Sequence, residues 1–382
     1  MEESHFNKEH SIKNRARIVS IDALRGFDMI WILGAQGIFA GLFALTAWPV
    51  FTQLEQQMLH SQWHGITAYD LIFPLFIFLS GLSIGLTGQS LSTQPKEKHV
   101  VMKAKLAKRL ALLCILGVIY NHAWGHGIPA NFDQIRFASV LARIGIAGSI
   151  ATLLVWYCSC RTQHIVLVGL LLGYWLILEF VVIGQYGGGD YSAQRALNIW
   201  FDQTLLPGAT YQNASVDPEG ILSNLGSIAN ALAGVFVGRF FIQRYSQQKP
   251  YCLMLIFYGL FALILGYGLS AVQPINKTLW TSTFAIVTIG YSILLFVIFH
   301  YLFDKVGSNS LGKGLSVIGM NAIVVYLASA LIDWQYVASS LFGGLIDAMP
   351  QAWQSLLMVI ALVSVQWAIL YFLYQRKIFI KL

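Results

Sequence analysis

Ten apolar segments, each close to the length of a bilayer-crossing helix, occupy most of this 382-residue chain. The hydrocarbon core of a bilayer is about 30 Å thick, and a helix needs about 20 apolar residues to cross it. We therefore predict ten transmembrane helices. The segments are 18–40, 67–86, 107–120, 137–157, 164–183, 221–241, 251–271, 279–303, 311–332 and 353–374. The third is short, so we expect its helix to begin within the basic stretch before it.

Composition excludes the other fold classes. Hydrophobic residues make up 57% of the chain, and Asp, Glu, Lys and Arg together only 11%. In soluble domains, about a quarter of all residues are charged. A soluble globule of this size has too little interior to hide so much apolar surface, and a disordered chain would be far more polar. The predicted fold class is therefore all-α, a polytopic membrane helix bundle.

Basic residues are distributed unevenly between alternate loops. With the N-terminus in the cytoplasm, 19 of the 24 Lys and Arg residues fall on the cytoplasmic side. Arg136, Arg195 and Lys277 remain on the outer side, and Arg25 and Arg143 lie inside predicted spans. Because cytoplasmic loops are enriched in Lys and Arg, we predict that both termini are cytoplasmic. The net charge of +7 then reflects membrane topology, and we expect no nucleic-acid partner.

We predict one transmembrane domain over residues 18–382, preceded by a cytoplasmic tail over residues 1–17. The tail is polar and lacks the apolar run of a signal peptide. The sequence shows no internal repeat, and its four cysteines are too few and too scattered for a disulfide framework. The largest loop, at 184–220, carries four acidic residues and is expected to be periplasmic.

Three charged residues lie close together in the first predicted span. Asp22, Arg25 and Asp28 are spaced three apart, so one helix face can carry all of them. A charged group at the centre of a membrane helix costs about 3 kcal/mol on insertion, which makes each one a candidate for function. Two interpretations remain open: a structural clasp that fixes the first helix, or part of a substrate site.

The outer edge of the second span combines imidazole, indole, phenol and carboxylate groups. They belong to His60, Trp63, His64, Tyr69 and Asp70. Trp and Tyr are expected at any membrane interface, so Trp63 and Tyr69 are consistent with an aromatic belt. Such a belt does not require a histidine at position 60, and histidine exchanges protons near neutral pH. His60 is therefore a candidate acid–base group.

The segment before the sixth span reads Asp217-Pro218-Glu219-Gly220. An acid at the cap and a proline at the first helical position are ordinary features of a helix start, and they account for Asp217 and Pro218 without a functional role. Glu219 can instead hold sugar hydroxyls or an amine if it faces a cavity. The helix start and the acceptor site therefore both remain as interpretations of this segment.

Isolated polar residues elsewhere give weaker signals. His122 and His126 are four residues apart, but no further ligand motif accompanies them, so we predict no metal site. Arg143 has no acid within a helical turn, so it needs a partner from another helix or an anionic ligand. Asn321 is a lone amide in an apolar span and is expected to make a helix–helix hydrogen bond.

Five sequence blocks follow one another across the membrane region. They are 17–26 (RIVSIDALRG), 60–74 with the pattern HxxWxGxTxxDLxFP, 217–238 beginning DPEGIL, 275–280 (INKTLW) and 320–326 (MNAIVVY). In content and order they resemble the heparan-α-glucosaminide N-acetyltransferase family of transmembrane enzymes. Within that family the chain is most similar to the bacterial branch labelled NagX, which is often linked to N-acetylglucosamine use.

Lysosomal members of this family carry acetyl groups from cytosolic acetyl-CoA to a terminal glucosamine across the membrane. The resemblance therefore implies a multi-pass acetyltransferase of the bacterial inner membrane, with acetyl-CoA as donor and an amino sugar or related glycan as acceptor. It also implies an active site that faces the periplasm. The family's proposed catalytic histidine corresponds to His60, which the predicted topology independently places on that side. Where the family has an asparagine near the end of the first span, this chain has Gln36.

Roles for acetyl transfer follow from the resemblance and from the chemistry of the residues. His60 is the predicted general base, with Asp70 as its orienting partner. Direct attack by the acceptor and an acetyl-imidazole intermediate on His60 both remain open. Gln36 or the indole N–H of Trp63 is predicted to donate to the oxyanion of the tetrahedral intermediate.

Predicted binding residues lie at both membrane edges. Arg25 and Arg143, with Asp22 beside the former, are predicted to bind the donor, because arginine can hold CoA phosphates while the pantetheine arm passes through the bundle. The predicted acceptor-binding residues are Trp63, Asp217, Glu219, Asn276 and Lys277.

Two other functions remain open at this point. An amino-sugar permease would also place charged residues within ten spans, although we find no inverted repeat of interrupted spans. O-acetylation of an envelope glycan would keep the chemistry and change the acceptor. Release of CoA that depends on His60 distinguishes an enzyme from a permease. The surroundings are membrane lipids in every case, and a homodimer is the default expectation.

Overall fold

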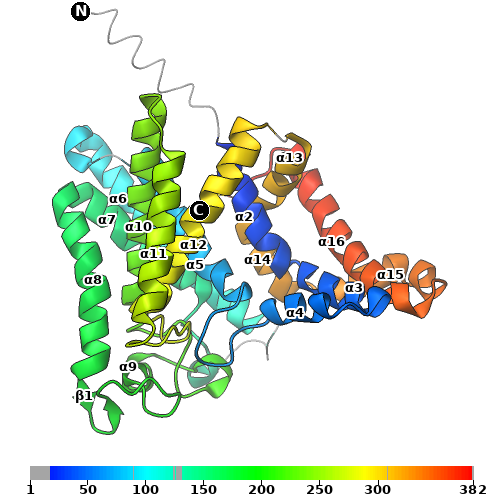
Figure 1. The fold of residues 1–382 in the computed structure, drawn as a ribbon, viewed down its shortest axis with the longest axis horizontal. Coiled ribbons are helices and arrows are strands. Elements are labelled where there is room, and N and C mark those ends of the chain that lie inside the picture. The colour runs from blue at the N-terminus through cyan, green and yellow to red at the C-terminus, as the bar shows by residue number, and fades with distance from the viewer. Residues whose placement is uncertain (1–17, 89, 124, 126–130, 308, 381–382) are drawn as a thin grey trace, which may run out of the picture.

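The computed structural model describes residues 18–380 except 89, 124, 126–130 and 308, so the predicted tail 1–17 and His126 lie outside the described residues. The predicted all-α fold class is confirmed (Figure 1), since the strands of the described chain form one two-residue hairpin, β1 (Val182–Ile183) with β2 (Tyr186–Gly187). The helices are α2 (Val19–Ile32), η1 (Ala35–Gly37), α3 (Ile38–Thr46), α4 (Pro49–Gln57), η2 (Tyr69–Leu71), α5 (Ile72–Thr87), η3 (Leu91–Thr93), α6 (Lys96–His122), η4 (Phe132–Gln134), α7 (Val140–Tyr157), α8 (Cys160–Phe180), α9 (Leu197–Leu205), η5 (Tyr211–Asn213), α10 (Asn224–Ser246), α11 (Cys252–Leu269), α12 (Ser282–Phe299), η6 (His300–Lys305), α13 (Asn309–Gly319), α14 (Ala322–Leu331), α15 (Trp334–Asp347) and α16 (Gln351–Gln375).

Nine of the ten predicted spans correspond to described helices that can cross a membrane by length and composition. Seven are single stretches, and two more are bent helix pairs. The single stretches are Tyr69–Thr93, Val140–Tyr157, Cys160–Phe180, Asn224–Ser246, Cys252–Leu269, Ser282–Lys305 and Gln351–Gln375. The remaining predicted segment, 107–120, lies in α6, which begins at Lys96 within the basic stretch, as expected.

Two predicted spans, 18–40 and 311–332, are bent by 68° and 61°. In the first, Gly34 adopts a φ of 104°, which glycine tolerates because it has no Cβ atom. In the second, the Asn321 side chain donates to the Ile378 carbonyl at 3.1 Å and accepts from the Ile380 N–H at 3.2 Å. The amide expected to join two helices thus binds the segment that follows α16.

The start of α2 is fixed by a residue far along the chain. The backbone N–H groups of Val19 and Ser20 donate to Asp304 of η6 at 3.0 and 3.3 Å. The same carboxylate lies 2.8 Å from Nδ1 of His300, whose Nε2 lies 2.7 Å from the Tyr251 hydroxyl. A carboxylate at a helix N-terminus satisfies N–H groups that have no partner within the helix. Asp304 therefore joins the first helix to the end of α12.

The helices α5 and α10 approach each other backbone to backbone. Gly81 and Gly85 of α5, and Gly234 and Gly238 of α10, are spaced four residues apart on the facing surfaces. A Cβ atom on any of the four would lie 1.8–2.4 Å from a backbone carbonyl oxygen of the opposite helix. Small residues at this spacing let membrane helices pack at short range, where van der Waals contact drives their association.

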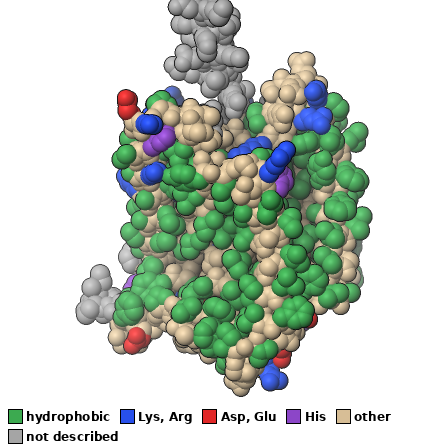
Figure 2. Space-filling view, turned by 90° about the vertical axis from the view of Figure 1, so that its left-hand side faces the viewer, with side chains coloured by type: hydrophobic (Ala, Val, Ile, Leu, Met, Phe, Trp, Pro, Cys, Tyr) green, Lys and Arg blue, Asp and Glu red, His purple; other side chains and the backbone are tan. Residues whose placement is uncertain are grey.

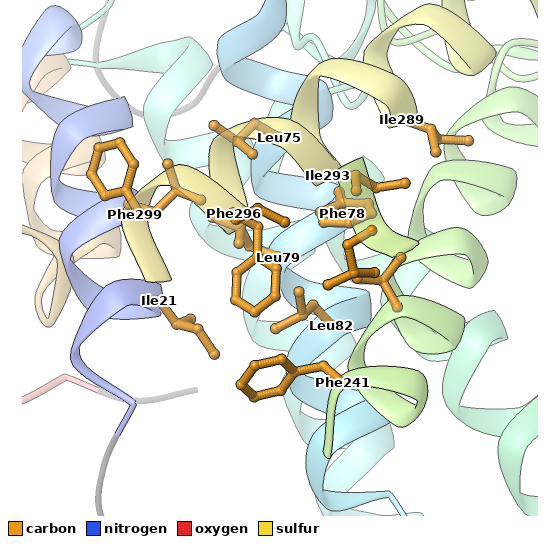
Figure 3. Close-up of a cluster of buried hydrophobic side chains, with 14 of the residues drawn as sticks. Ile21, Leu75, Phe78, Leu79, Leu82, Phe241, Ile289, Ile293, Phe296 and Phe299 are labelled. Atoms are coloured by element: carbon orange, nitrogen blue, oxygen red, sulfur yellow. The ribbon is translucent and has the colours of Figure 1, made fainter. Parts of the chain in front are cut away.

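Large apolar side chains fill the space around this contact (Figure 3). They come mainly from α5, α10 and α12. Those labelled include Leu75, Phe78, Leu79 and Leu82 of α5, Phe241 of α10, and Ile293 and Phe296 of α12. Because these side chains interdigitate at the centre of the bundle, α5 is held along one face over most of its length.

The two ends of the bundle differ in charge. Figure 2 shows an apolar middle, with Lys and Arg side chains gathered mostly at the end where α2 begins. We call this the basic end. The opposite end holds the segment 184–220 with β1, β2 and α9, and we call it the loop end (Figure 1).

Gly81→Ala is expected to lower the free energy of unfolding by about 1–3 kcal/mol, because the added methyl group forces α5 and α10 apart. Gly169→Ala on α8 is the matched control, since no atom lies within 4 Å of the added Cβ atom there. Thermal unfolding of the purified variants in detergent, followed by circular dichroism, measures both effects. Equal melting temperatures for the Gly81→Ala variant and the wild type would contradict the close contact.

Candidate active site

One cavity of about 1300 Å³ follows α5 from the basic end to the loop end. Most of its lining residues on η2 and α5 recur at helical spacing and lie on one face: Tyr69, Ile72, Phe73, Phe76, Ser80, Ser83, Ile84 and Thr87. Asp70 and Leu86 line it as well. The 16 residues of α5 alone extend over about 24 Å. Ile18, Asp22 and Arg25 line the cavity at the basic end, and His60 and Lys277 line it at the loop end.

Three charged or titratable groups meet at the loop end. Nδ1 of His60 lies 2.8 Å from Oδ1 of Asp70, and Nζ of Lys277 lies 3.2 Å from the same oxygen. Nζ of Lys277 is also 2.8 Å from Nδ1 of His60. The Asp70 side chain is fully buried, Lys277 is 18% exposed and His60 is 56% exposed. The carboxylate therefore lies beneath the two groups that face the cavity.

A tight loop after α4 wraps around Asp70. Its Oδ2 accepts hydrogen bonds from the Ser61 and Thr67 N–H groups at 3.1 and 3.2 Å, and from the Thr67 hydroxyl at 3.1 Å. The loop turns at Gly65, which has a φ of 107° and donates its N–H to the Ile275 carbonyl at 2.8 Å. This pairing brings the loop before α12, and with it Lys277, against His60.

Asn276 joins the same two loops from beneath. It is fully buried, and its side chain donates to the Trp63 carbonyl at 2.9 Å and accepts from the Leu279 N–H at 2.8 Å. Its amide is thus engaged within the protein, although we predicted it as an acceptor-binding residue. The indole N–H of Trp63 donates to the Tyr191 carbonyl at 2.8 Å, while the residue itself lines the cavity.

Gln36, the other predicted oxyanion donor, lies in η1 at the bend of the first span. It is not among the described residues that line the cavity. Its Oε1 atom is buried and has no hydrogen-bond partner in the described part of the chain. Gln36 therefore does not share with His60 the cavity lining that the structure describes.

Arg136 anchors the acidic side of the loop end. Its guanidinium donates to both carboxylate oxygens of Asp217, at 2.8 and 2.6 Å, to Glu219, and to the Asn121 side chain at 3.2 Å. Asp217 is fully buried in this pair, whereas Glu219 and Arg136 also line the cavity. Burial disfavours the charged guanidinium, but the two carboxylates outweigh it and raise the pKa of Arg136 above its ordinary value.

Asp202 of α9 binds the backbone of the turn 217–221. Its carboxylate accepts the Asp217 N–H at 3.1 Å and the Ile221 N–H at 3.0 Å. Burial raises the pKa of Asp202 to about 6, although the two N–H groups favour its charged form. The interpretation of Asp217 as the cap of the sixth span is wrong, because α10 begins at Asn224 with Ser223 at the cap position. Asp217 is instead held by Asp202 and Arg136.

Arg143 lies outside the cavity lining that the structure describes. It is 1% exposed, and its Nη2 donates to the Gly220 carbonyl at 3.2 Å and to the Ser223 hydroxyl. Its guanidinium lies 4.8 Å from the centre of the Trp280 ring. The partner that the sequence required thus comes from the start of α10. This placement leaves Arg25 as the predicted donor-binding arginine that lines the cavity.

Arginines also face the cavity away from the loop end. Arg25 donates to the Ser83 hydroxyl at 2.7 Å and lies 3.7 Å from Asp22, so two members of the predicted charged face are near each other. The third, Asp28, is 3% exposed, and its Oδ2 has no hydrogen-bond partner among the described residues. Arg109 of α6 lines the cavity further in, and its Nε is buried without such a partner.

Sequence reasoning missed several lining residues. Tyr120 of α6 and Tyr326 of α14 stack with ring centres 4.0 Å apart and line the cavity near the loop end. In the distribution of Lys and Arg described above, Arg109 is one of the 19 residues on the cytoplasmic side. Its position directly before an apolar stretch is the signal that it lies deeper than the rest of the basic stretch.

Comparisons with known proteins agree with the resemblance described above. The chain is 26% identical to human heparan-alpha-glucosaminide N-acetyltransferase over 373 residues, which cover 83% of this chain and 53% of that protein. It is 25% identical to the mouse enzyme of the same name over 329 residues, 72% of this chain and 49% of that protein. The chain thus spans about half the length of these curated relatives. No family model matches it.

Arg136→Gln is expected to cost about 3–5 kcal/mol of stability, because it leaves two largely buried carboxylates without their cation. The matched control is Arg195→Gln at the same end of the bundle. The Arg195 side chain is 62% exposed and lies 3.9 Å from Asp190, so its loss should change stability by less than about 0.5 kcal/mol. Thermal unfolding in detergent compares the two variants, and equal shifts would argue against the buried cluster.

Proposed function

We propose that this protein is a transmembrane acetyltransferase that moves an acetyl group from acetyl-CoA to a glucosamine-type amine. The observation that carries the proposal is the cavity, which is lined by Arg25 toward one end and by His60, Asp70 and Lys277 at the other. The similarity to the two N-acetyltransferases supports the type of reaction. The bacterial branch, inner-membrane location and homodimer stay predictions.

The donor enters, in this proposal, from the basic end, which the distribution of Lys and Arg assigns to the cytoplasm. Arg25 and Arg109 suit the phosphates of CoA, because arginine forms strong charge-assisted hydrogen bonds with phosphate oxygens. The buried Nε of Arg109, which has no hydrogen-bond partner among the described residues, is a donor that such an anion would satisfy. The apolar residues along α5 then leave a path for the pantetheine arm toward His60.

The acceptor binds, in this proposal, at the loop end, and we propose that this end faces the periplasm, in agreement with the predicted topology. The stacked Tyr120 and Tyr326 rings, with Trp63, provide aromatic faces of the kind that line small-molecule sites. Glu219 faces the same space, where its carboxylate can accept hydrogen bonds from sugar hydroxyls or an amine. Asp217 and Asn276 are assigned to holding the site together.

In the proposed reaction, the acceptor amine attacks the thioester carbonyl directly and His60 removes its proton. Asp70 accepts a hydrogen bond from Nδ1, which leaves the Nε2 lone pair as the base. One cavity reaches both groups of lining residues, so donor and acceptor can be present together and no acetylated enzyme is needed.

His60→Gln is expected to lower kcat for acetyl transfer by about 10²–10⁴-fold, because the general base is lost. His164→Gln is the control and should retain full activity, because His164 is exposed in the first turn of α8 and is not among the described residues that line the cavity. The assay follows free CoA and acetylglucosamine together with purified protein in detergent. Uptake of N-acetylglucosamine by proteoliposomes without any CoA release would contradict the proposal and favour a permease.

Arg109→Gln is expected to raise KM for acetyl-CoA by about 10–100-fold, which corresponds to the loss of a hydrogen bond to a charged group. S-acetylpantetheine lacks the nucleotide phosphates, so its KM should not change. Comparison of the two donors in the same assay provides the control. An equal effect on both would place Arg109 away from the phosphates.

A further inference from the structure

We propose that Lys277 is the catalytic acid of this reaction, which protonates the thiolate of the departing CoA and then regains its proton from His60. The inference rests on the proposed acetyl transfer and assigns Lys277 a different task from the acceptor binding predicted from sequence. It is argued from the arrangement of Lys277, His60 and Asp70 around one cavity.

The geometry lets one ammonium group serve three neighbours. Nζ of Lys277 is 3.2 Å from Oδ1 of Asp70, and it is 2.8 and 3.4 Å from Nδ1 and Nε2 of His60. An ammonium carries three hydrogens. Asp70 accepts one of them and His60 lies beside the second. The third is available to the cavity, which Lys277 and His60 line together.

The nitrogen Nδ1 of His60 cannot satisfy both neighbours in the same tautomer. It either donates to Asp70 or accepts from Lys277, since a neutral imidazole carries its proton on one nitrogen. The first tautomer leaves Nε2 as a base, and the second leaves Nε2–H as a donor. Transfer of a proton from Lys277 to Nδ1 of the second form gives the imidazolium, and loss of the Nε2 proton from the imidazolium gives the first form.

The proton balance closes within this trio. As the C–N bond forms and the C–S bond breaks, the acceptor nitrogen loses a proton to His60 and Lys277 gives a proton to the sulfur. The products are the acetylated amine and CoA thiol. The imidazolium of His60 then passes its Nε2 proton to the neutral Lys277 amine, whose Nζ lies 3.4 Å from Nε2, and both groups return to their starting forms. No further acid, base or oxidant is required.

The total charge of Asp70, Lys277 and His60 stays the same during the reaction, and this accounts for a cation beside Asp70. Before transfer the trio holds Asp70 negative, Lys277 positive and His60 neutral. After transfer, Asp70 is negative, Lys277 neutral and His60 positive. The fully buried carboxylate thus has one adjacent cation at every stage, which avoids the large cost of an uncompensated buried charge.

Electrostatics around Lys277 are consistent with this role. Burial lowers the pKa of Lys277 and outweighs Asp70 and Glu219, which raise it, while Arg143 lowers it further. A general acid works best when its pKa is nearer the working pH than that of a free lysine. Activity should therefore fall on the alkaline side as Lys277 loses its proton.

The test compares Lys277→Met and Lys277→Arg with acetyl-CoA and glucosamine. Arginine keeps the positive charge beside Asp70 but does not release a proton at ordinary pH. We expect kcat to fall by about 100-fold or more in both variants, with KM for acetyl-CoA within about 3-fold and the alkaline limb of the kcat profile lost. Lys249→Met, exposed at the basic end, is the control with unchanged activity. Melting temperature and acetyl-CoA binding report folding.

Each other outcome has a distinct meaning. Full activity of Lys277→Arg would overturn the inference, because a charge alone would then suffice. A rise in the KM for glucosamine with kcat unchanged would also overturn it and assign Lys277 to acceptor binding. Absence of CoA release by the wild type would overturn the proposed function and this step with it.

Discussion

The buried carboxylate of Asp70 organises the loop end of the cavity. A buried carboxylate is costly unless its oxygens are satisfied, and here one oxygen takes the Ser61 and Thr67 donors while the other faces His60 and Lys277. These donors come from two loops that are more than 200 positions apart in the chain. Folding of both loops is therefore coupled to one ionised side chain. The same side chain fixes the position of the His60 imidazole through its contact with Nδ1.

The helix α5 runs from the loop end toward the basic end. One of its faces packs against α10, and the opposite face lines the cavity. Gly81 and Gly85 bring its backbone against α10, where no side chain intervenes. Phe76, Ser80 and Ser83 lie toward the opposite side and line the cavity. Tight packing on one side and open space on the other follow from the same helical repeat. The result is a long cavity along one face of a helix whose opposite face is closely packed.

The positions of the spans were predictable because bilayer thickness sets a length that apolar segments must reach. The bends were not, because they depend on the φ angle of Gly34 and on the partner that Asn321 finds in the C-terminal segment. Periodicity carries neither piece of information. The short helix α15, which cannot cross a bilayer alone, was missed for a related reason: it is held by α16 rather than by its own pattern.

The site was partly predictable for a similar physical reason. His60 and Asp70 were selected as ionisable groups at a membrane edge and Lys277 as an acceptor-binding residue, and the structure brings the three together. Of the three basic residues that depart from the cytoplasmic bias, Arg136 and Lys277 both line the cavity. A basic residue on the predicted outer side therefore indicated the candidate active site in two of three cases. Arg109, Tyr120 and Tyr326 carried no such sign, since they follow the rules for basic runs and interfacial aromatics.

The attachment of α2 to Asp304 has a consequence for how the molecule is assembled. The first helix leaves the ribosome long before residue 304 is made. Until then, the N–H groups of Val19 and Ser20 lack the Asp304 carboxylate that accepts their hydrogen bonds. Contacts between positions so distant in sequence form slowly, because a long loop must close first. The cavity wall that contains Asp22 and Arg25 therefore reaches its final position only after the chain has been synthesised through η6. An interrupted or truncated chain that ends before η6 would retain the early helices without a finished entrance at the basic end.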